Sequence, residues 1–429
     1  MALRPGYKTT AIGVIPEDWL VVTLESITDP RAPIRYGVVQ IGSDTPSGIP
    51  IVPIKFIKEI SSAPLPRSAR SIEARFAGSR ICAGDVLLSV KGTIGRVGIV
   101  PDHFEGNIAR EIARLRIKNE EYPRFVMCQL EGNHTQRRIN DAVVGTTRLE
   151  FSISAVRKFA IAMPSSQAER KEIACALSEI EDLTSALSHL IAKKRDLRQG
   201  AMQRLLTGQT RLPGFTAPWQ EKRLGALGRF MKGSGVRRDE AQSGDIPCVR
   251  YGEIYTTHQN VVRHFASYIS RAVAHSATRI QRGDILFAAS GETKEEIGKC
   301  VALAHDVEAY AGGDIIILRP TSGDPVFLGY LLNTPHVVRQ KANKGQGDAV
   351  VHIGALALAA IEISVPDENE QAAIAGVLSD MDAEISALET RFDKTLALKQ
   401  AMMQALLTGR VRLPVRRDEA PHTKEAAHA

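Results

Sequence analysis

The chain has 429 residues, of which 44% are hydrophobic and 24% charged, a composition typical of folded globular proteins that excludes a disordered one. The length predicts two or three domains. No apolar stretch approaches the roughly 20 residues that cross a bilayer, and the N-terminus lacks the apolar segment of a signal peptide. The five cysteines lie far apart, which indicates free thiols in a reducing compartment. We therefore expect a cytoplasmic protein with no membrane partner and no metal site.

The excess positive charge lies in two separate blocks. The formal net charge of the chain is +7. Residues 1–164 contain 22 Lys and Arg against 16 Asp and Glu, and residues 208–366 contain 18 against 15. The helical stretches at 165–207 and 367–408 contain 7 against 6 and 3 against 8. Because a basic surface attracts polyanions, we place nucleic acid on the two basic blocks.

The first block, residues 1–164, is predicted to be a mixed α/β globule. Gly84-Asp85 directly precedes the apolar run "VLL", a pattern typical of a turn that leads into a buried strand. The sequence "RLRI" near residue 114 predicts a further strand.

A long helix follows at 165–207. Apolar residues recur there at alternating spacings of three and four, which predicts a helix with one face packed against a partner helix. Ser165 and Ser166 can cap its start, and Gly208 can end it in a left-handed conformation. The seam residues are Ile173, Leu177, Ile180, Leu187 and Ile191.

The remaining chain repeats this plan at an offset of about 201 residues. A second globule is predicted at 208–366, a second helix at 367–408 and a tail at 409–429. "LLTGQTRLP" at 205–213 recurs as "LLTGRVRLP" at 406–414, where Gly409 matches Gly208. The globules share further residues, such as Trp19 with Trp219 and Asp85 with Asp284. The second seam contains Ile374, Leu378, Met381, Ile385, Leu388 and Phe392.

These repeats predict an α+β protein that consists of two similar globules and two long helices. Each helix of about 43 residues measures roughly 65 Å at 1.5 Å per residue. If the seams of the two helices pack together, the helices form an antiparallel coiled coil, and the two halves are related by an approximate two-fold axis. Two basic globules at a fixed separation suit a DNA target that is split into two half-sites.

The doubled "LLTG-x-x-RLP" phrase and the "IP-x-x-W" or "PW" that opens each globule resemble the specificity subunit of type I restriction-modification enzymes. The resemblance extends from about Ile12 to Pro414. It implies two target-recognition domains, joined by the central and C-terminal conserved helices, in a non-catalytic subunit that reads a bipartite, asymmetric target in double-stranded DNA. It also implies two methyltransferase (modification) subunits and two restriction (translocase-nuclease) subunits as partners. S-adenosylmethionine, ATP and Mg would belong to those partners, and this chain would bind no cofactor.

Two alternatives remain at this point: a specificity or regulatory subunit of a related defence system, and a coiled-coil scaffold that does not bind DNA. A catalytic role is not supported by any motif, because the sequence contains neither a G-x-x-x-x-G-K-[ST] phosphate loop nor the Asn/Asp-Pro-Pro-aromatic motif of adenine methyltransferases.

Basic and amide side chains in Gly-rich loops are the candidates for DNA contacts, because Arg and Lys suit guanine edges and Gln suits adenine. Each could equally bind a phosphate. They are Lys91, Arg96, Arg148, Lys294, Lys299, Lys344, Gln346 and His352. The recurrence of Arg-Leu in the repeated phrase suggests a doubled docking surface for partner subunits. Its residues are Leu205, Leu206, Arg211, Leu212, Leu406, Leu407, Arg412 and Leu413.

Overall fold

The protein consists of two compact units, each of which combines one globule with parts of both long helices. Unit 1 comprises residues 1–188 and 391–429, and unit 2 comprises residues 189–390. The computed structural model describes residues 5–118, 123–143, 149–347 and 350–414.

Helices α6 (Gln167–Leu205) and α12 (Glu368–Leu406) begin and end within two residues of the predicted positions. The boundary between the units runs through both helices, because the two ends of each helix contact different globules. The globule in each unit is completed by the end of one helix and the start of the other.

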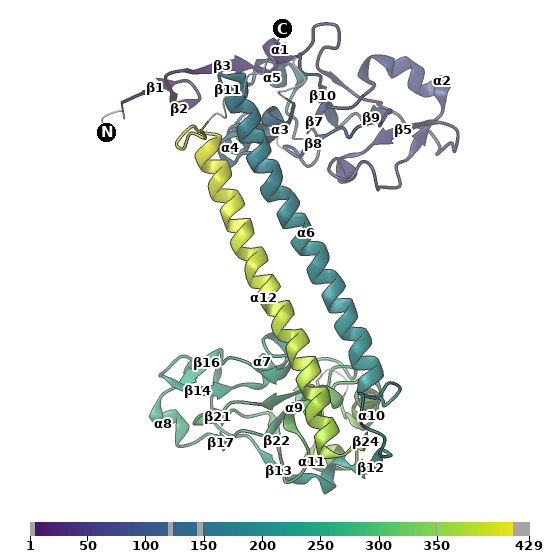
Figure 1. The fold of residues 1–429 in the computed structure, drawn as a ribbon, viewed down its shortest axis with the longest axis vertical. Coiled ribbons are helices and arrows are strands. Elements are labelled where there is room, and N and C mark those ends of the chain that lie inside the picture. Colours follow the sequence, from purple (N-terminus) through teal and green to yellow (C-terminus); the bar gives the residue numbers. More distant parts are fainter. Residues whose placement is uncertain (1–4, 119–122, 144–148, 348–349, 415–429) are drawn as a thin grey trace, which may run out of the picture. The chain divides into compact units, whose positions relative to one another are not determined.

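Unit 1 is built around a four-stranded antiparallel sheet in the order β4-β10-β7-β8 (Figure 1). These strands are Arg35–Tyr36, Ile112–Leu115, Val86–Ser89 and Val97–Ile99. The run after Gly84-Asp85 forms the buried strand β7, as predicted. Its alternate side chains enter two different apolar clusters, Val86 and Leu88 on one face and Leu87 on the other. Both faces of this strand are therefore covered, which explains its unbroken apolar sequence.

Smaller elements surround the main sheet of unit 1. Two strand pairs are formed by β1 (Tyr7–Thr10) with β2 (Gly13–Pro16) and by β3 (Trp19–Thr23) with β11 (Ala160–Pro164). A three-stranded sheet consists of β6 (Arg67–Ser68), β5 (Ile49–Val52) and β9 (Asn107–Ile108). The helices are α1 (Leu24–Ile27), α2 (Arg70–Glu73), α3 (Pro123–Glu131), α4 (Asn133–Asp141) and α5 (Ile153–Lys158).

Unit 2 repeats the main sheet and adds one strand, in the order β13-β22-β18-β20-β15. These strands are Gly228–Lys232, Ile315–Pro320, Ile285–Ala288, Cys300–Leu303 and Asn260–Val262. Strand β18 follows Gly283-Asp284 and, like β7, divides its side chains between two clusters. The helices α9 (Pro325–Leu331), α10 (Pro335–Lys344) and α11 (Ala355–Ala359) occupy the chain positions of α3, α4 and α5.

The other elements of unit 2 form a second sheet and two strand pairs. The second sheet has the order β16-β14-β21-β17, with strands Ser267–Ile269, Ile246–Val249, Ala309–Ala311 and Thr278–Ile280. The pairs are β12 (Gln220–Arg223) with β24 (Glu362–Val365) and β19 (Ser290–Gly291) with β23 (Val351–His352), and the short helices are α7 (Tyr251–Thr256) and α8 (Arg271–Ala274).

The predicted signals at the helix ends are present. Ser166 Oγ accepts a hydrogen bond from the amide of Glu169 at 3.4 Å, and Asp367 Oδ1 accepts one from the amide of Glu370 at 3.1 Å. Gly208 and Gly409 have φ angles of +70° and +68°, the left-handed conformation that ends a helix. Both long helices therefore begin with a side-chain cap and end at glycine.

The apolar seam of both helices is buried. Eight seam residues are less than 9% exposed, namely Ile173, Leu177, Ile180, Leu187, Ile191, Ile374, Leu378 and Ile385. Met381, Leu388 and Phe392 are partly buried. Within unit 2, Lys194 at a seam position pairs with Glu384 at 2.6 Å and Arg198 pairs with Asp382. Within unit 1, Lys399 pairs with Glu181. The two helices run antiparallel in each unit, and ion pairs accommodate the charged residues of the seam.

Across the described ranges, no helix combines the length and the apolar content that a membrane span requires.

Candidate nucleic-acid interface

Each main sheet carries a glycine-containing hairpin loop, residues 90–95 in unit 1 and residues 289–298 in unit 2. The first loop is closed where the amide of Ser89 donates to the carbonyl of Arg96 at 2.8 Å and the amide of Gly95 donates to Ser89 at 3.0 Å. The second is closed by the same two contacts, from Ala288 to Lys299 at 2.9 Å and from Gly298 to Ala288 at 3.2 Å. The two loops therefore have equivalent ends and differ in length.

A second chain segment lies against each hairpin loop. The carbonyl of Val90 accepts a hydrogen bond from the amide of Phe151 at 2.9 Å, and the carbonyl of Ala289 accepts one from Ile353 at 3.0 Å. One residue further along, an antiparallel bridge joins Lys91 to Glu150 in unit 1 and Ser290 to His352 in unit 2. Each unit thus brings a hairpin and the segment before α5 or α11 together into one surface site, which we call the hairpin site.

The hairpin site of unit 1 contains a compact cluster of charge. Lys91 Nζ lies 3.3 Å from Glu150 Oε1 and 4.4 Å from the centroid of the Tyr36 ring. The Tyr36 hydroxyl donates a hydrogen bond to Glu150, and this bond keeps the pKa of Glu150 below its ordinary value. Burial and the same bond raise the pKa of Tyr36 to about 12. The charge of Lys91 is therefore balanced by a carboxylate beside it.

A basic groove of about 500 Å³ adjoins the hairpin in unit 1. Its lining includes the basic residues Arg96, Lys55 and Lys58 and the carboxylates Glu59 and Glu131, of which Glu131 pairs with Lys58 at 2.5 Å. Arg96 is exposed, and among the residues that the structure describes it has no carboxylate within ion-pair distance. Guanidinium and ammonium groups in a groove of this kind suit phosphate oxygens. Lys55 and Lys58 could not be recognised from the sequence, because they lie far from the hairpin in the chain and no repeat marks them.

The hairpin site of unit 2 has different side chains. Ser290 Oγ and His352 Nδ1 are 3.0 Å apart. The backbone of Gln346 exchanges two hydrogen bonds with that of His352, at 2.9 and 2.7 Å, so these three residues form one cluster. Gln346 and His352 are exposed. The amide and the imidazole are both groups that can read base edges through hydrogen bonds.

The other candidate residues for DNA contact differ in how far they are exposed to solvent. Lys294 is exposed at the tip of the hairpin, and Lys344 is partly buried in the last turn of α10. Lys299 does not face solvent freely as Arg96 does. Its Nζ donates to the carbonyl of Tyr255 at 3.2 Å, and burial lowers its pKa. Arg148 lies outside the described residues. The role of these residues in DNA binding stays a prediction.

Comparison with known proteins connects these two sites to one family. The family model of the type I restriction modification DNA specificity domain matches the chain twice, at residues 46–194 and 217–397, which together are most of the chain. The chain belongs to this type I restriction-modification specificity family. Each match contains one hairpin site, so the family's domain occurs twice in this member.

Individual relatives agree with this assignment. The specificity subunit of the type I restriction enzyme EcoBI of Escherichia coli is 26% identical over 217 residues, which cover 48% of this chain and 44% of that subunit. The aligned part thus spans less than half of the curated relative. The S subunit of the type I restriction-modification system of M. genitalium has a similar fold, with a TM-score of 0.61 at 15% identity, over 95% of this chain and 98% of the other. A chain from work on complex assembly and conformational transition of the type I R-M system has a TM-score of 0.51 at 17% identity, over 92% and 99% of the two chains.

An ion pair between a buried aspartate and a partly exposed arginine supports the strand that leads into each hairpin of this specificity-family member. Asp85 accepts two hydrogen bonds from Arg116, at 2.9 and 2.7 Å, and Asp284 accepts two from Arg319, both at 2.8 Å. Each carboxylate also accepts a backbone amide three residues earlier in the chain. The Gly-Asp signal was visible in the sequence, whereas the arginine partners were not, because they lie 31 and 35 residues away.

The repeated phrase makes contacts inside each unit, and whether it also docks partner subunits, as the sequence suggested, stays a prediction. The leucine pair that opens each copy is buried: Leu406 and Leu407 belong to the core of unit 1, and Leu205 and Leu206 to that of unit 2. In unit 2, Arg211 donates two hydrogen bonds to the buried Glu370, both at 2.6 Å. The phrase therefore recurs because it fastens the end of one helix to the start of the other.

The arginine of the second copy makes the same closure in unit 1. Arg412 binds the buried Glu169 in the first turn of α6, with one contact at 2.7 Å, and it also binds Asp18 at 3.0 and 2.8 Å. We call this pair of contacts, Arg211 with Glu370 and Arg412 with Glu169, the closing corners. Leu212 and Leu413 beside them are partly exposed, and whether they contact a partner stays a prediction.

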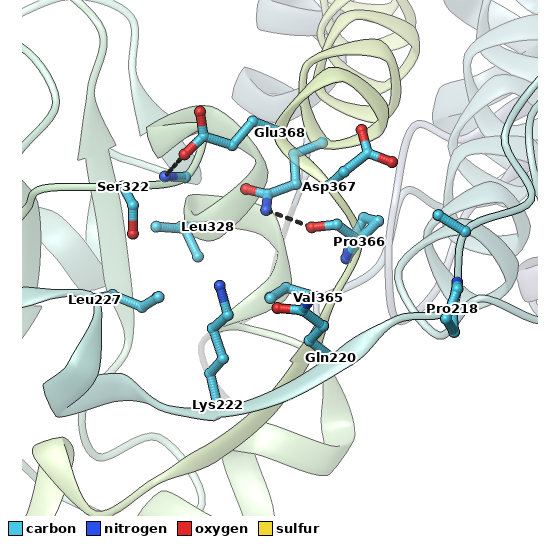
Figure 2. A pocket seen from close by; sticks show the side chains of 13 residues that line it. Pro218, Gln220, Lys222, Leu227, Ser322, Leu328, Val365, Pro366, Asp367 and Glu368 are labelled. Carbon is cyan, nitrogen blue, oxygen red and sulfur yellow. Dashed lines mark hydrogen bonds between the residues drawn. The ribbon is translucent and has the colours of Figure 1, made fainter.

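A cavity of about 210 Å³ lies near the closing corner of unit 2, where α12 begins. Figure 2 shows Lys222 extending from β12 toward this cavity, with Glu368 on its far side. Glu368 accepts the amide of Gly323 at 2.9 Å, and the Gln371 side chain donates to the carbonyl of Pro366 at 2.9 Å. These polar groups connect the start of the helix to the globule, so their positions are explained by a structural role.

Proposed function

We propose that this chain reads a bipartite DNA sequence, one half through each hairpin site, and holds the catalytic subunits of a type I restriction-modification complex on that DNA. One observation carries the proposal: the same backbone arrangement occurs in both units, with different side chains at equivalent positions. Lys91 in unit 1 corresponds to Ser290 in unit 2, and Glu150 corresponds to His352. A common frame with different hydrogen-bonding groups suits the recognition of two different base sequences.

The target is therefore asymmetric. A lysine–glutamate pair presents one ammonium donor and carboxylate acceptors, whereas serine, histidine and glutamine present a mixture of neutral donors and acceptors. Because each base pair shows its own pattern of donors and acceptors in the major groove, these two sets favour different bases. The exposed basic residues of the groove in unit 1 supply contacts to phosphates, and these contacts make binding weaken steeply as salt rises.

The partners in this proposal are two methyltransferase subunits and two restriction subunits. Two copies of each are expected because the chain contains two similar units, so a surface that recurs in both units offers the same partner two docking sites. The specificity-family match supports this assignment, and a solved relative comes from work on complex assembly of the type I R-M system. Methylation with S-adenosylmethionine, ATP hydrolysis and Mg-dependent cleavage are assigned to the partners, so this chain has no activity of its own. The complex acts on DNA in the cytoplasm.

Mapping methylated adenines across the genome, with and without this gene, tests the proposal. The expected result is a split motif that is methylated in the intact strain and unmethylated in the deletion. A matched assay with the purified chain and S-adenosylmethionine should give no methylation until the methyltransferase subunits are added. Persistence of the methylated motif after deletion, or methylation by the purified chain alone, contradicts the proposal.

A further inference from the structure

In each unit a polar side chain from a neighbouring helix donates hydrogen bonds to the hairpin loop, and the function described so far does not use it. In unit 1, Gln136 of α4 directs its side-chain amide at two backbone carbonyls, that of Gly95 at 2.8 Å and that of Leu130 at 2.5 Å. Gly95 ends the hairpin loop, and Leu130 lies at the end of α3. One NH₂ group therefore ties the loop to the helix beneath it.

Unit 2 makes the same bridge with a different residue. Lys341 of α10 donates to the carbonyl of Gly298 at 2.7 Å and to that of Leu332 at 2.9 Å. Gly298 ends the second hairpin loop, and Leu332 caps α9. Lys341 is 1% exposed, and burial lowers its pKa. The contact does not depend on the charge, because a neutral amine still has two N–H donors for the two carbonyls.

The two bridging residues come from helix positions one turn apart. The helices α4 and α10 begin after Gly132 and Thr334, so Gln136 corresponds to Val338, and Lys341 corresponds to Ile139. The burial pattern agrees, since Ile139 and Lys341 are both buried, whereas Gln136 and Val338 are both partly buried. The longer side chain starts one turn further along its helix. The bridge is thus the common feature, rather than one residue at one position.

The loop position that contacts the bridging side chain is a glycine in both units. Gly95 and Gly298 have φ angles of +88° and +69°. A Cβ atom on Gly95 would lie 2.5 Å from the Gln136 amide oxygen, and one on Gly298 would lie 3.1 Å from Lys341 Cδ. Both glycines therefore let the backbone rest directly on the bridging side chain. Each loop is therefore held at two places: by the backbone pairing with Glu150 or His352, and by the side chain of Gln136 or Lys341.

We propose that Gln136 and Lys341 are positioning residues for DNA recognition, each fixing the hairpin loop of its own unit so that the loop's side chains meet the bases in one orientation. This inference rests on the proposed function of the hairpin sites. The side-chain N–H groups of both residues donate to backbone carbonyls, so we assign neither residue a contact with DNA. Each acts through the glycine carbonyl, and the loss of one should affect only the half-site that its own loop reads.

The test uses the chain assembled with its methyltransferase subunits, and duplexes with a single base pair changed in one half-site or the other. The measured quantity is the ratio of kcat/KM on the intact target to that on each altered duplex. Lys341→Met should lower this ratio about tenfold for changes in one half-site and leave the other half-site unchanged, because a misplaced loop loses the discrimination of a base contact. Gln136→Leu should do the same at the opposite half-site.

Transplanting the bridge provides the rescue. The double variant Val338→Gln, Lys341→Ile gives unit 2 the arrangement of unit 1 and should restore the ratio. Arg339→Met, on the exposed face of α10, removes the same charge and should change the rates on all duplexes alike. If the Met variant fails to assemble, the double variant decides: an assembled double variant that lacks discrimination overturns the inference.

Two further results would also overturn it: unchanged discrimination in an assembled Lys341→Met complex, or equal loss at both half-sites. Failure of the proposed function gives a different result, since the wild-type complex itself would then show no sequence-specific methylation.

Discussion

The closing corners and the hairpin sites of this protein repeat in opposite ways. At the closing corners the residues recur: an arginine after the helix-ending glycine binds a buried glutamate in the first turn of the other helix, in both units. At the hairpin sites only the backbone recurs, and the side chains differ. A contact that stabilises the fold in the same way in both units requires the same residues twice. Two different base sequences require different side chains on the same backbone arrangement. We therefore interpret the residues that recur at the closing corners as part of the fold's assembly, and those that differ at the hairpin sites as the groups that the proposed function assigns to recognition.

The largest effect is expected from the ion pairs of Asp85 and Asp284, which precede the strands that lead into the hairpins. Asp85 and Asp284 bind equivalent arginines, but unit 1 has a second arginine nearby, Arg114, which is 2% exposed. Burial lowers the pKa of Arg114, and Asp85 opposes this effect. Asp85→Asn should therefore leave two uncompensated guanidinium groups and lower the free energy of unfolding by about 3 kcal/mol, and Asp284→Asn by about 2 kcal/mol.

Thermal and denaturant unfolding of the two single variants check this order. The asparagine side chain keeps the size and can still accept the backbone amide, so the difference reports the charge. Equal losses in the two variants would mean that Arg114 does not depend on Asp85.

A smaller effect is expected from the exposed ion pairs between the helices. In unit 2, Lys194 and Glu384 are 2.6 Å apart, and their side chains are 29% and 49% exposed. Solvent and salt screen such a pair, so its coupling energy should be about 0.5 kcal/mol and should decrease at high ionic strength. A double-mutant cycle with Lys194→Ala and Glu384→Ala measures it. A coupling above about 2 kcal/mol would place this pair with the buried pairs instead.

Periodic and repeated features could be predicted from the sequence. The heptad spacing, the capping residues and the final glycines located α6 and α12 to within two residues, and Gly-Asp before an apolar run located β7 and β18. These features depend on residues close together in the chain. The α+β architecture with two similar globules follows from them.

Contacts between distant residues could not be predicted in the same way. The recurring Arg-Leu was visible, but one sequence does not show which face it takes, and the arginines turn inward to Glu370 and Glu169. Arg96 and Lys299 occupy equivalent positions, yet among the residues that the structure describes only the Lys299 side chain donates to a carbonyl of its own globule. The contacts of Gln136 and Lys341 with the hairpin loops could not be found by comparing the two halves of the sequence at a fixed offset. The two residues occupy helix positions that are one turn apart.

Methylation motifs of two point variants test the central claim, that each hairpin site reads one half of the target, most directly. Lys91→Ala changes the site of unit 1, and His352→Ala changes that of unit 2. Genome-wide mapping of methylated adenines in strains that carry each variant should show a relaxed sequence in one half of the motif for Lys91→Ala and in the other half for His352→Ala. Relaxation of the same half by both variants, or of both halves by either one, would contradict the account.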